Sequence, residues 1–156
     1  MKYLKIILLS LTPLFFTQIA SAHCQVPCGI FADELKFGEL EQHIETISKA
    51  SIKITEIAAK DELTADDRQQ LVRWVKQKES HAQKVIDESA NYFLAQRVKL
   101  DTDHYKEKIE LLHHIIIYAM KSKQSSDGKA AEVLSEKLAA FKSLYLHHDH
   151  GEGAHH

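Results

Sequence analysis

Hydrophobic residues recur at steps of three and four along most of the chain beyond residue 31, a spacing typical of amphipathic helices. The pattern predicts four helices, over residues 33–60, 64–96, 102–122 and 129–146. No segment shows the alternation of a strand, and the connections between helices are short. Short connections place consecutive helices side by side in opposite directions. We therefore expect an all-α fold, an antiparallel up-down four-helix bundle over residues 32–146.

Each predicted helix has one apolar face that would lie in the core, where its burial contributes about 25 cal/mol per Å². The inward positions are, helix by helix, Phe37, Leu40, Ile44, Ile47, Ser51, Ile54 and Ala58; Leu71, Trp74, Val75, Ala82, Val85, Ser89, Tyr92 and Phe93; Tyr105, Ile109, Leu112, Ile116 and Ala119; and Ala131, Leu134, Leu138, Phe141 and Tyr145. On the third helix Leu111, Ile115 and Ile117 widen the apolar surface. That width suggests contact with two neighbours or with another subunit.

Local signals mark two helix starts and one loop. Asp33 belongs to a residue type that caps helix N-termini, and we expect it to cap the first helix. Thr64, followed by Asp67, resembles a capping box at the start of the second helix. Residues 123–128, Lys-Gln-Ser-Ser-Asp-Gly, have the composition of a loop and separate the last two helices.

The first 22 residues have the organisation of a secretory signal peptide. Lys2 and Lys5 form a positive start, residues 6–16 are largely apolar, and Ala20-Ser21-Ala22 is a small-residue cleavage site. The apolar stretch is too short to span a bilayer, which takes about 20 residues. We therefore expect signal peptidase to release a chain that begins at His23. That chain would be periplasmic or extracellular, with no membrane attachment after processing.

Composition narrows the possible partners of this processed chain. Its 134 residues carry 18 lysines and arginines against 22 aspartates and glutamates. A mildly acidic chain has no electrostatic footprint for nucleic acid. The length suits a single domain with its own core.

The two cysteines, Cys24 and Cys28, directly follow the predicted cleavage site. In an exported protein a local disulfide is one interpretation. A metal site is the other, because residues 23–28 offer the α-amine and imidazole of His23, the amide nitrogen of Cys24 and two thiolates. Two nitrogens and two sulfurs in one plane suit Ni(II) or Cu(II), and the imidazole can reach an axial position. Zinc would prefer a tetrahedron.

The segment His23-Cys24-x-x-Pro27-Cys28-Gly29-x-Phe31 resembles the N-terminal nickel hook of the nickel-containing superoxide dismutases. The resemblance implies a four-helix bundle, usually a homohexamer. It implies that superoxide is the substrate and that nickel, cycling between Ni(II) and Ni(III), dismutates it to dioxygen and hydrogen peroxide. It also implies that His23, Cys24 and Cys28 supply the catalytic metal ligands. Residues 23–31 are called the hook below.

The resemblance also indicates residues around the metal ligands. Glu39 lies where the family has a glutamate that holds the axial imidazole, and Tyr92 corresponds to a family tyrosine in an Asp-Tyr-Phe run. Phe31 replaces the tyrosine that closes the family's motif, so it keeps the ring and lacks the hydroxyl. The family's second-helix arginine has three candidate counterparts, Arg73, Lys76 and Lys78.

The remaining histidines fall into two groups. The last ten residues, 147–156, hold five of the eleven histidines and are expected to form a disordered tail. Such a tract can capture Ni, Cu or Zn, or can simply aid solubility. The tail histidines are His147, His148, His150, His155 and His156. The helical histidines are His43, His81, His104, His113 and His114; with no i, i+4 pair among them, we expect polar or boundary positions.

Three alternatives to a nickel enzyme remain open on the sequence. Copper could occupy the same hook and support the same reaction. A non-catalytic nickel- or copper-binding protein could use the hook together with the tail. A helical interaction protein could carry a Cys24–Cys28 disulfide and no metal.

Overall fold

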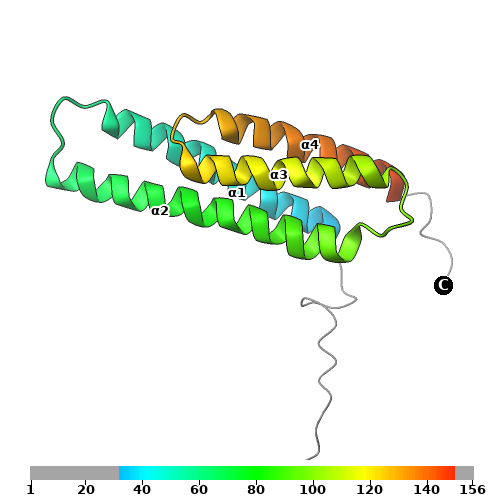
Figure 1. Cartoon of the computed structure of the whole chain (residues 1–156). Coiled ribbons are helices and arrows are strands. Elements are labelled where there is room, and N and C mark those ends of the chain that lie inside the picture. The colour runs from blue at the N-terminus through cyan, green and yellow to red at the C-terminus, as the bar shows by residue number, and fades with distance from the viewer. Residues whose placement is uncertain (1–31, 150–156) are drawn as a thin grey trace, which may run out of the picture.

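The computed structural model describes residues 32–149, and the regular elements in this range are all helical (Figure 1). In chain order they are α1 (Asp33–Ala58), α2 (Ala65–Asp87), η1 (Glu88–Arg97), α3 (Tyr105–Gln124) and α4 (Lys129–Asp149). η1 is a π-helix that continues α2 directly. The prediction of an all-helical bundle is confirmed. The predicted leader, the hook and residues 150–156 lie outside the described range.

The helices pack along their lengths around the predicted apolar faces. α1 lies against α2 and α3 against α4, and further contacts join α2 to α3 and α1 to α4. At one end of the core four buried rings, Phe37, Phe93, Phe141 and Tyr145, meet with centroid separations of 4.8–5.7 Å. Aromatic pairs of this kind contribute about 0.5–1.5 kcal/mol beyond the area they bury. The rings therefore tie α1, η1 and α4 together at that end.

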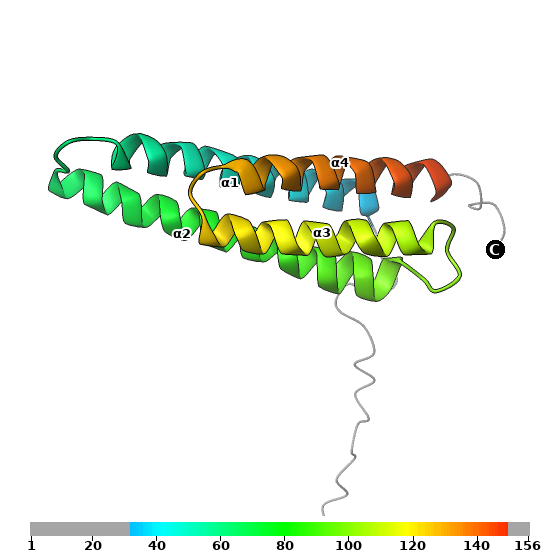
Figure 2. The ribbon, with the colours of Figure 1, turned by 45° about the horizontal axis from the view of Figure 1, so that its top comes forward.

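The paired helices α1 and α2 extend further than α3 and α4 at the opposite end, as both Figure 1 and Figure 2 show. Lys123, close to the end of α3, donates to the Gln83 side chain at 2.8 Å, so the first part of α2 runs past α3. Four residues predicted to be buried lie in the extended part and are exposed or half-exposed: Ala58, Leu71, Trp74 and Val75. The prediction was wrong there because periodicity identifies an apolar face but not how far the neighbouring helices reach.

The buried face of α3 differs from the predicted one by one position. Ile115 is fully buried, whereas Ile116 is only partly buried. Lys108 also lies on the buried face, where its aliphatic stem packs inward and its Nζ donates to Thr102 Oγ1 at 3.1 Å. The sequence could not resolve this rotation because residues 115–117 are all isoleucine.

The capping signals had different outcomes. The Asp67 N–H donates to Thr64 Oγ1 and the Thr64 N–H donates to the Asp67 carboxylate, each at 3.1 Å, so the capping box is confirmed. Gly128 has a φ of 76° just before α4, a conformation that favours glycine. Asp33 does not cap α1, because Ala32 is the N-cap residue and makes no side-chain hydrogen bond there. The Asp33 carboxylate is held by other helices instead.

The C-terminal helix continues past its predicted end at Leu146, through Asp149. The backbone of the first tail residues is therefore helical. None of the helices in the described range is long and apolar enough to cross a membrane.

Candidate functional site

Asp33, two residues after the hook, is the centre of a hydrogen-bonded cluster. Its Oδ1 accepts from Tyr92 Oη at 2.6 Å and from Arg97 Nε at 2.9 Å. Its Oδ2 accepts from the Arg97 guanidinium at 2.5 Å and from Tyr145 Oη at 2.8 Å. The Ala32 N–H donates to Tyr92 Oη at 3.1 Å. These contacts fix the point at which the chain passes from the hook into the bundle. Asp33, Tyr92, Arg97 and Tyr145 are called the Asp33 cluster below.

The π-helix explains how Tyr92 and Arg97 reach the same carboxylate. In an α-helix each residue turns by about 100°, so residues five apart point roughly 140° away from each other. η1 instead forms i→i+5 hydrogen bonds, and the Val98 N–H donates to the Phe93 carbonyl at 2.9 Å. Residues five apart then lie nearly above one another. Insertions of this kind occur frequently at functional sites.

Burial and pairing set the charges of the cluster. Burial would raise the pKa of Asp33, but hydrogen bonds from Arg97, Tyr92 and Tyr145 bring it below its ordinary value. Burial and the bond to Asp33 raise the pKa of Tyr92 to about 12. Burial would lower the pKa of Arg97, but the bond to Asp33 raises it. At neutral pH the Asp33 carboxylate and the Arg97 guanidinium are therefore charged, and the Tyr92 hydroxyl keeps its proton. Tyr92 acts here by positioning Asp33.

Glu39 and Tyr92, two predicted site residues, lie on either side of Lys36. The Lys36 Nζ donates to Glu39 Oε2 at 2.8 Å and to Glu88 Oε1 at 3.2 Å. The same Nζ lies 5.6 Å from the centroid of the Tyr92 ring. Burial would lower the pKa of Lys36, but the two carboxylates raise it. The structure thus brings Glu39 and Tyr92 together at the end of the bundle that follows the hook.

The candidate cations on the second helix lie elsewhere. Arg73 and Lys76 are exposed in the extended part of α2. Lys78 is buried, and its Nζ donates to the backbone carbonyls of Ser125 and Lys123 at the end of α3. The cation that pairs with Glu39 is Lys36, on α1 itself. This partner was missed, although lysine and glutamate at i, i+3 are neighbours on a helix.

A pair of histidines was also missed. His43 on α1 and His81 on α2 approach with their Nδ1 atoms 3.1 Å apart and their rings nearly perpendicular, at 83°. Both side chains are half-buried, as expected of boundary positions. They lie 38 positions apart, so no spacing along one helix could have shown the pair.

The predicted metal ligands His23, Cys24 and Cys28 lie outside the described residues, as does Phe31. The same holds for the side chains of the tail histidines, which are His147, His148, His150, His155 and His156. Among the described side chains, residues 32–146, no three histidine, cysteine, aspartate or glutamate side chains are grouped so that they could hold a metal ion.

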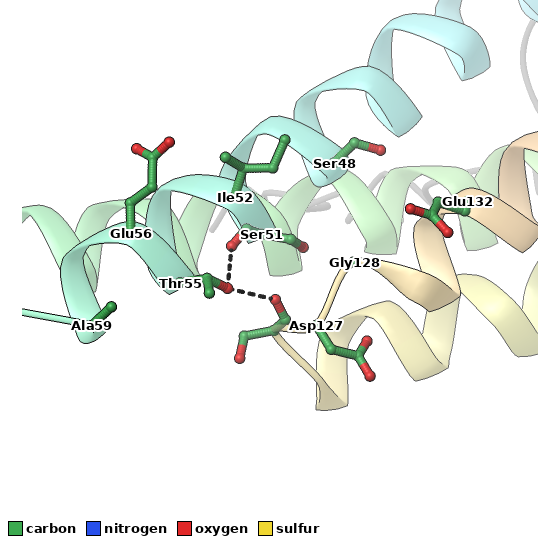
Figure 3. A pocket seen from close by; sticks show the side chains of 10 residues that line it. Ser48, Ser51, Ile52, Thr55, Glu56, Ala59, Asp127, Gly128 and Glu132 are labelled. Carbon is green, nitrogen blue, oxygen red and sulfur yellow. Dashed lines mark hydrogen bonds between the residues drawn. The ribbon is translucent and has the colours of Figure 1, made fainter.

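A groove of about 390 Å³ lies at the other end of the bundle, between the second half of α1 and the α3–α4 loop (Figure 3). Thr55 Oγ1 lies there within 3.0 Å of the Ser51 carbonyl and 3.2 Å of the Ser126 carbonyl. Among the described residues, its lining includes no histidine or cysteine and none of the predicted site residues. The groove and the predicted site are therefore separate places.

The described helices define a class, the helical-bundle proteins, and a metal-binding N-terminal segment is the prediction made from the sequence. The model of one family, nickel-containing superoxide dismutase, matches residues 18–149, a range that includes the hook. The chain belongs to this family. No curated protein and no solved structure matches the chain.

Membership of the family establishes the activity and the cofactor. The protein is a superoxide dismutase, an oxidoreductase that uses nickel and has superoxide as its substrate. Copper loading and a purely non-catalytic role are not favoured by this match. The donor types that residues 23–28 offer are compatible with nickel, because amine, amide and thiolate donors suit a square-planar ion.

Proposed function

We propose that this nickel superoxide dismutase acts through its hook, with His23, Cys24 and Cys28 as the metal ligands. The observation that carries the proposal is that one family match spans both the hook and the bundle behind it. Bound nickel supplies one-electron redox chemistry between Ni(II) and Ni(III). The chain itself supplies the donor atoms, their orientation and the support behind them.

The described residues provide that support from the bundle side. Ala32 follows Phe31 directly, and its N–H is bonded to Tyr92, which is in turn bonded to Asp33. The chain therefore has a fixed position one residue beyond the hook. Glu39 is held by Lys36 on the same end of the bundle and is the proposed partner of the His23 imidazole. Supporting groups of this kind change metal affinity or activity by about 10–100-fold.

Export is part of the proposal, because cleavage after Ala22 creates the α-amine of His23 as a ligand. The sequence of the first 22 residues supports it. The same cleavage would release the protein into the periplasm or the extracellular space. The histidines of the tail would serve as auxiliary metal capture.

We further propose an antiparallel up-down topology and assembly into a homohexamer. The topology is supported by the Asp33 cluster, which joins the start of α1 to the ends of η1 and α4. The hexamer is carried over from the family resemblance, and exposed large apolar side chains on the bundle are candidate contacts for other subunits. The exposed residues are Leu35, Ile52, Val72, Val75, Leu94, Leu100 and Met120.

The test uses natively exported protein. Intact mass gives the mature N-terminus, metal analysis gives the nickel content, and pulse radiolysis gives superoxide turnover. We expect a chain that begins at His23, contains nickel and turns over superoxide. After oxidation, EPR should show rhombic low-spin Ni(III) and not Cu(II). A mature start at any other residue, or turnover by nickel-free protein, would refute the proposal.

Two variants provide matched controls. A chain with one extra residue before His23 keeps both cysteines but moves the α-amine, and we expect it to fold and to lose turnover. Cys28→Ser keeps the N-terminus but removes one thiolate, with the same expected loss. Circular dichroism verifies the helices in both. Full activity in either variant would contradict the ligand assignment.

A further inference from the structure

A pair of histidines lies between α1 and α2, away from the hook in sequence. His43 and His81 place their Nδ1 atoms 3.1 Å apart, with ring centroids 4.9 Å apart. The two side chains come from adjacent helices of the bundle, so their relative position depends on the folded structure. This pair does not depend on any residue of the hook.

The separation of the two nitrogens matches what a single ion requires. Imidazole nitrogens bind zinc at about 2.0–2.1 Å, so two of them at ligand angles of roughly 90–109° lie about 2.9–3.4 Å apart. The observed distance of 3.1 Å falls inside that interval. The geometry therefore suits a shared ion as well as it suits a hydrogen bond.

The protonation states also suit metal binding. Burial lowers the pKa of both histidines, and the positive charge of Lys84 lowers both further. Electrostatic interactions with His81 and Lys36 also lower the pKa of His43, whereas the interaction with Glu39 raises it. The rings are therefore neutral at pH 7, with one Nδ1 donating to the other. To bind an ion, the donor ring moves its proton from Nδ1 to Nε2, and neither ring loses a proton overall.

Glu39 lies close to the pair along α1, but it is the proposed partner of the His23 imidazole and is not counted as a ligand here. It precedes His43 by four residues on α1, which places both side chains on the same face of the helix. Its carboxylate is bonded to Lys36, so the pair of imidazoles is the fixed part of the site. Because no three ligands are grouped among the side chains of residues 32–146, water would complete the coordination. Lys36 and Lys84 add positive charge, so the affinity should be modest.

We propose that His43 and His81 form an interhelical binding site for a borderline divalent ion such as Zn(II), Ni(II) or Cu(II), distinct from the nickel hook. Imidazole nitrogen is a ligand that all three ions accept. An ion held there links α1 to α2 and stabilises the folded chain.

Thermal unfolding of the nickel-loaded mature protein tests the proposal, with Zn(II) as the added probe. An ion that binds only the folded state raises the Tm in proportion to RT ln(1 + [L]/Kd). The tail histidines are neighbours in sequence and are present in the unfolded chain too, so zinc on the tail shifts the Tm little. We expect zinc to raise the Tm by a few degrees in the wild type and not in His43→Gln or His81→Gln.

His113→Gln is the matched control, because His113 and His114 are also paired rings but lie next to each other on α3, with centroids 6.3 Å apart. This variant should keep the full zinc-dependent rise. An equal rise in the wild type and in both His43→Gln and His81→Gln, or no rise in the wild type, would overturn the proposal.

A measurement on the wild type covers the case in which a variant fails to fold. Nitrogen-15 NMR of the histidine rings should show zinc changing the Nδ1 resonances of two histidines in the bundle, those of His43 and His81. Changes confined to other histidines would overturn the proposal, and would leave the assignment of nickel to the hook unaffected.

Discussion

Each end of the bundle contains a cation shielded from solvent, half-buried Arg97 at one end and buried Lys78 at the other, and the two are held in different ways. At the end that follows the hook, Arg97 is bonded to the carboxylate of Asp33, which two tyrosines also contact. At the opposite end, Lys78 donates to the backbone carbonyls of Lys123 and Ser125 at the end of α3. Arg97 and the side chains around it connect η1 to α1 and α4. Lys78 instead caps the C-terminal end of α3. The difference shows that, among the described residues, side-chain hydrogen bonds between helices are more numerous at the start of α1, next to the predicted hook, than at the opposite end.

The two ends also differ in how tightly their side chains pack. This difference leads to the largest expected change in the free energy of unfolding. Phe93 is fully buried in the aromatic group near Asp33, whereas Leu71 is half-exposed on the extended part of α2. Phe93→Ala should lower the free energy of unfolding by about 4 kcal/mol, and Leu71→Ala by about 1 kcal/mol, because a cavity opens only at the first site. Urea unfolding measures both. Equal losses would show that the two ends are equally well packed.

Replacing each cation by methionine compares the two ends directly. Arg97→Met leaves the Asp33 carboxylate without its ion pair and should cost about 2–3 kcal/mol of stability. Lys78→Met removes a buried charge that donates to backbone carbonyls, so its effect should stay within about 1 kcal/mol. Arg97→Met should also lower nickel content, whereas Lys78→Met should not. A larger loss from Lys78→Met would reverse the comparison.

The charge of Asp33 makes the stability of this end depend on acid. The folded-state pKa of Asp33 lies below its unfolded value of about 3.9, so the carboxylate stabilises the fold above that pH. This contribution is lost as the pH falls through the folded-state pKa. The difference in unfolding free energy between wild type and Asp33→Asn should therefore be the same at pH 7 and pH 5 and smaller at pH 3. A difference that persists unchanged at pH 3 would show that the carboxylate charge is not what stabilises this end.

The smallest effect is expected at the start of α2. Thr64→Ala removes one half of the capping box and should cost about 1 kcal/mol. Because Thr64 lies in the turn furthest from Asp33 along α2, nickel content and superoxide turnover should be unchanged. Reduced turnover per bound nickel would show that the two ends are coupled.

The features that could be predicted are those that depend on near neighbours in the sequence. Periodicity placed the helices, and the Thr64–Asp67 box was found because its two residues lie three positions apart. The prediction that Asp33 caps α1 was wrong because its carboxylate bonds to Tyr92 and Tyr145, which lie 59 and 112 positions away in the sequence. Residues 88–97 carry no local sequence signal for a π-helix. Its widened turn goes with the bonds that Tyr92 and Arg97 both make to the Asp33 carboxylate.

In the predicted site, too, residues could be found from the sequence, whereas contacts between helices could not. The hook was predicted from six fixed positions within nine residues, five of them identical to the family motif, and Glu39 and Tyr92 from their place in the resemblance. The pairing of Glu39 with Lys36 was visible in the sequence and was overlooked. The contact of His43 with His81 crosses two helices, so it required the packing of the bundle.

The bond from Tyr145 to Asp33 also affects the order of events during folding. It joins residues 112 positions apart, so loop closure over almost the whole bundle must precede it. While the chain is being made, Asp33 can find Tyr92 and Arg97 first, and the last hydrogen bond forms only when α4 docks. The residues next to the hook are therefore fully ordered only in a finished bundle, and a chain truncated before Tyr145 would present the hook on an incomplete base.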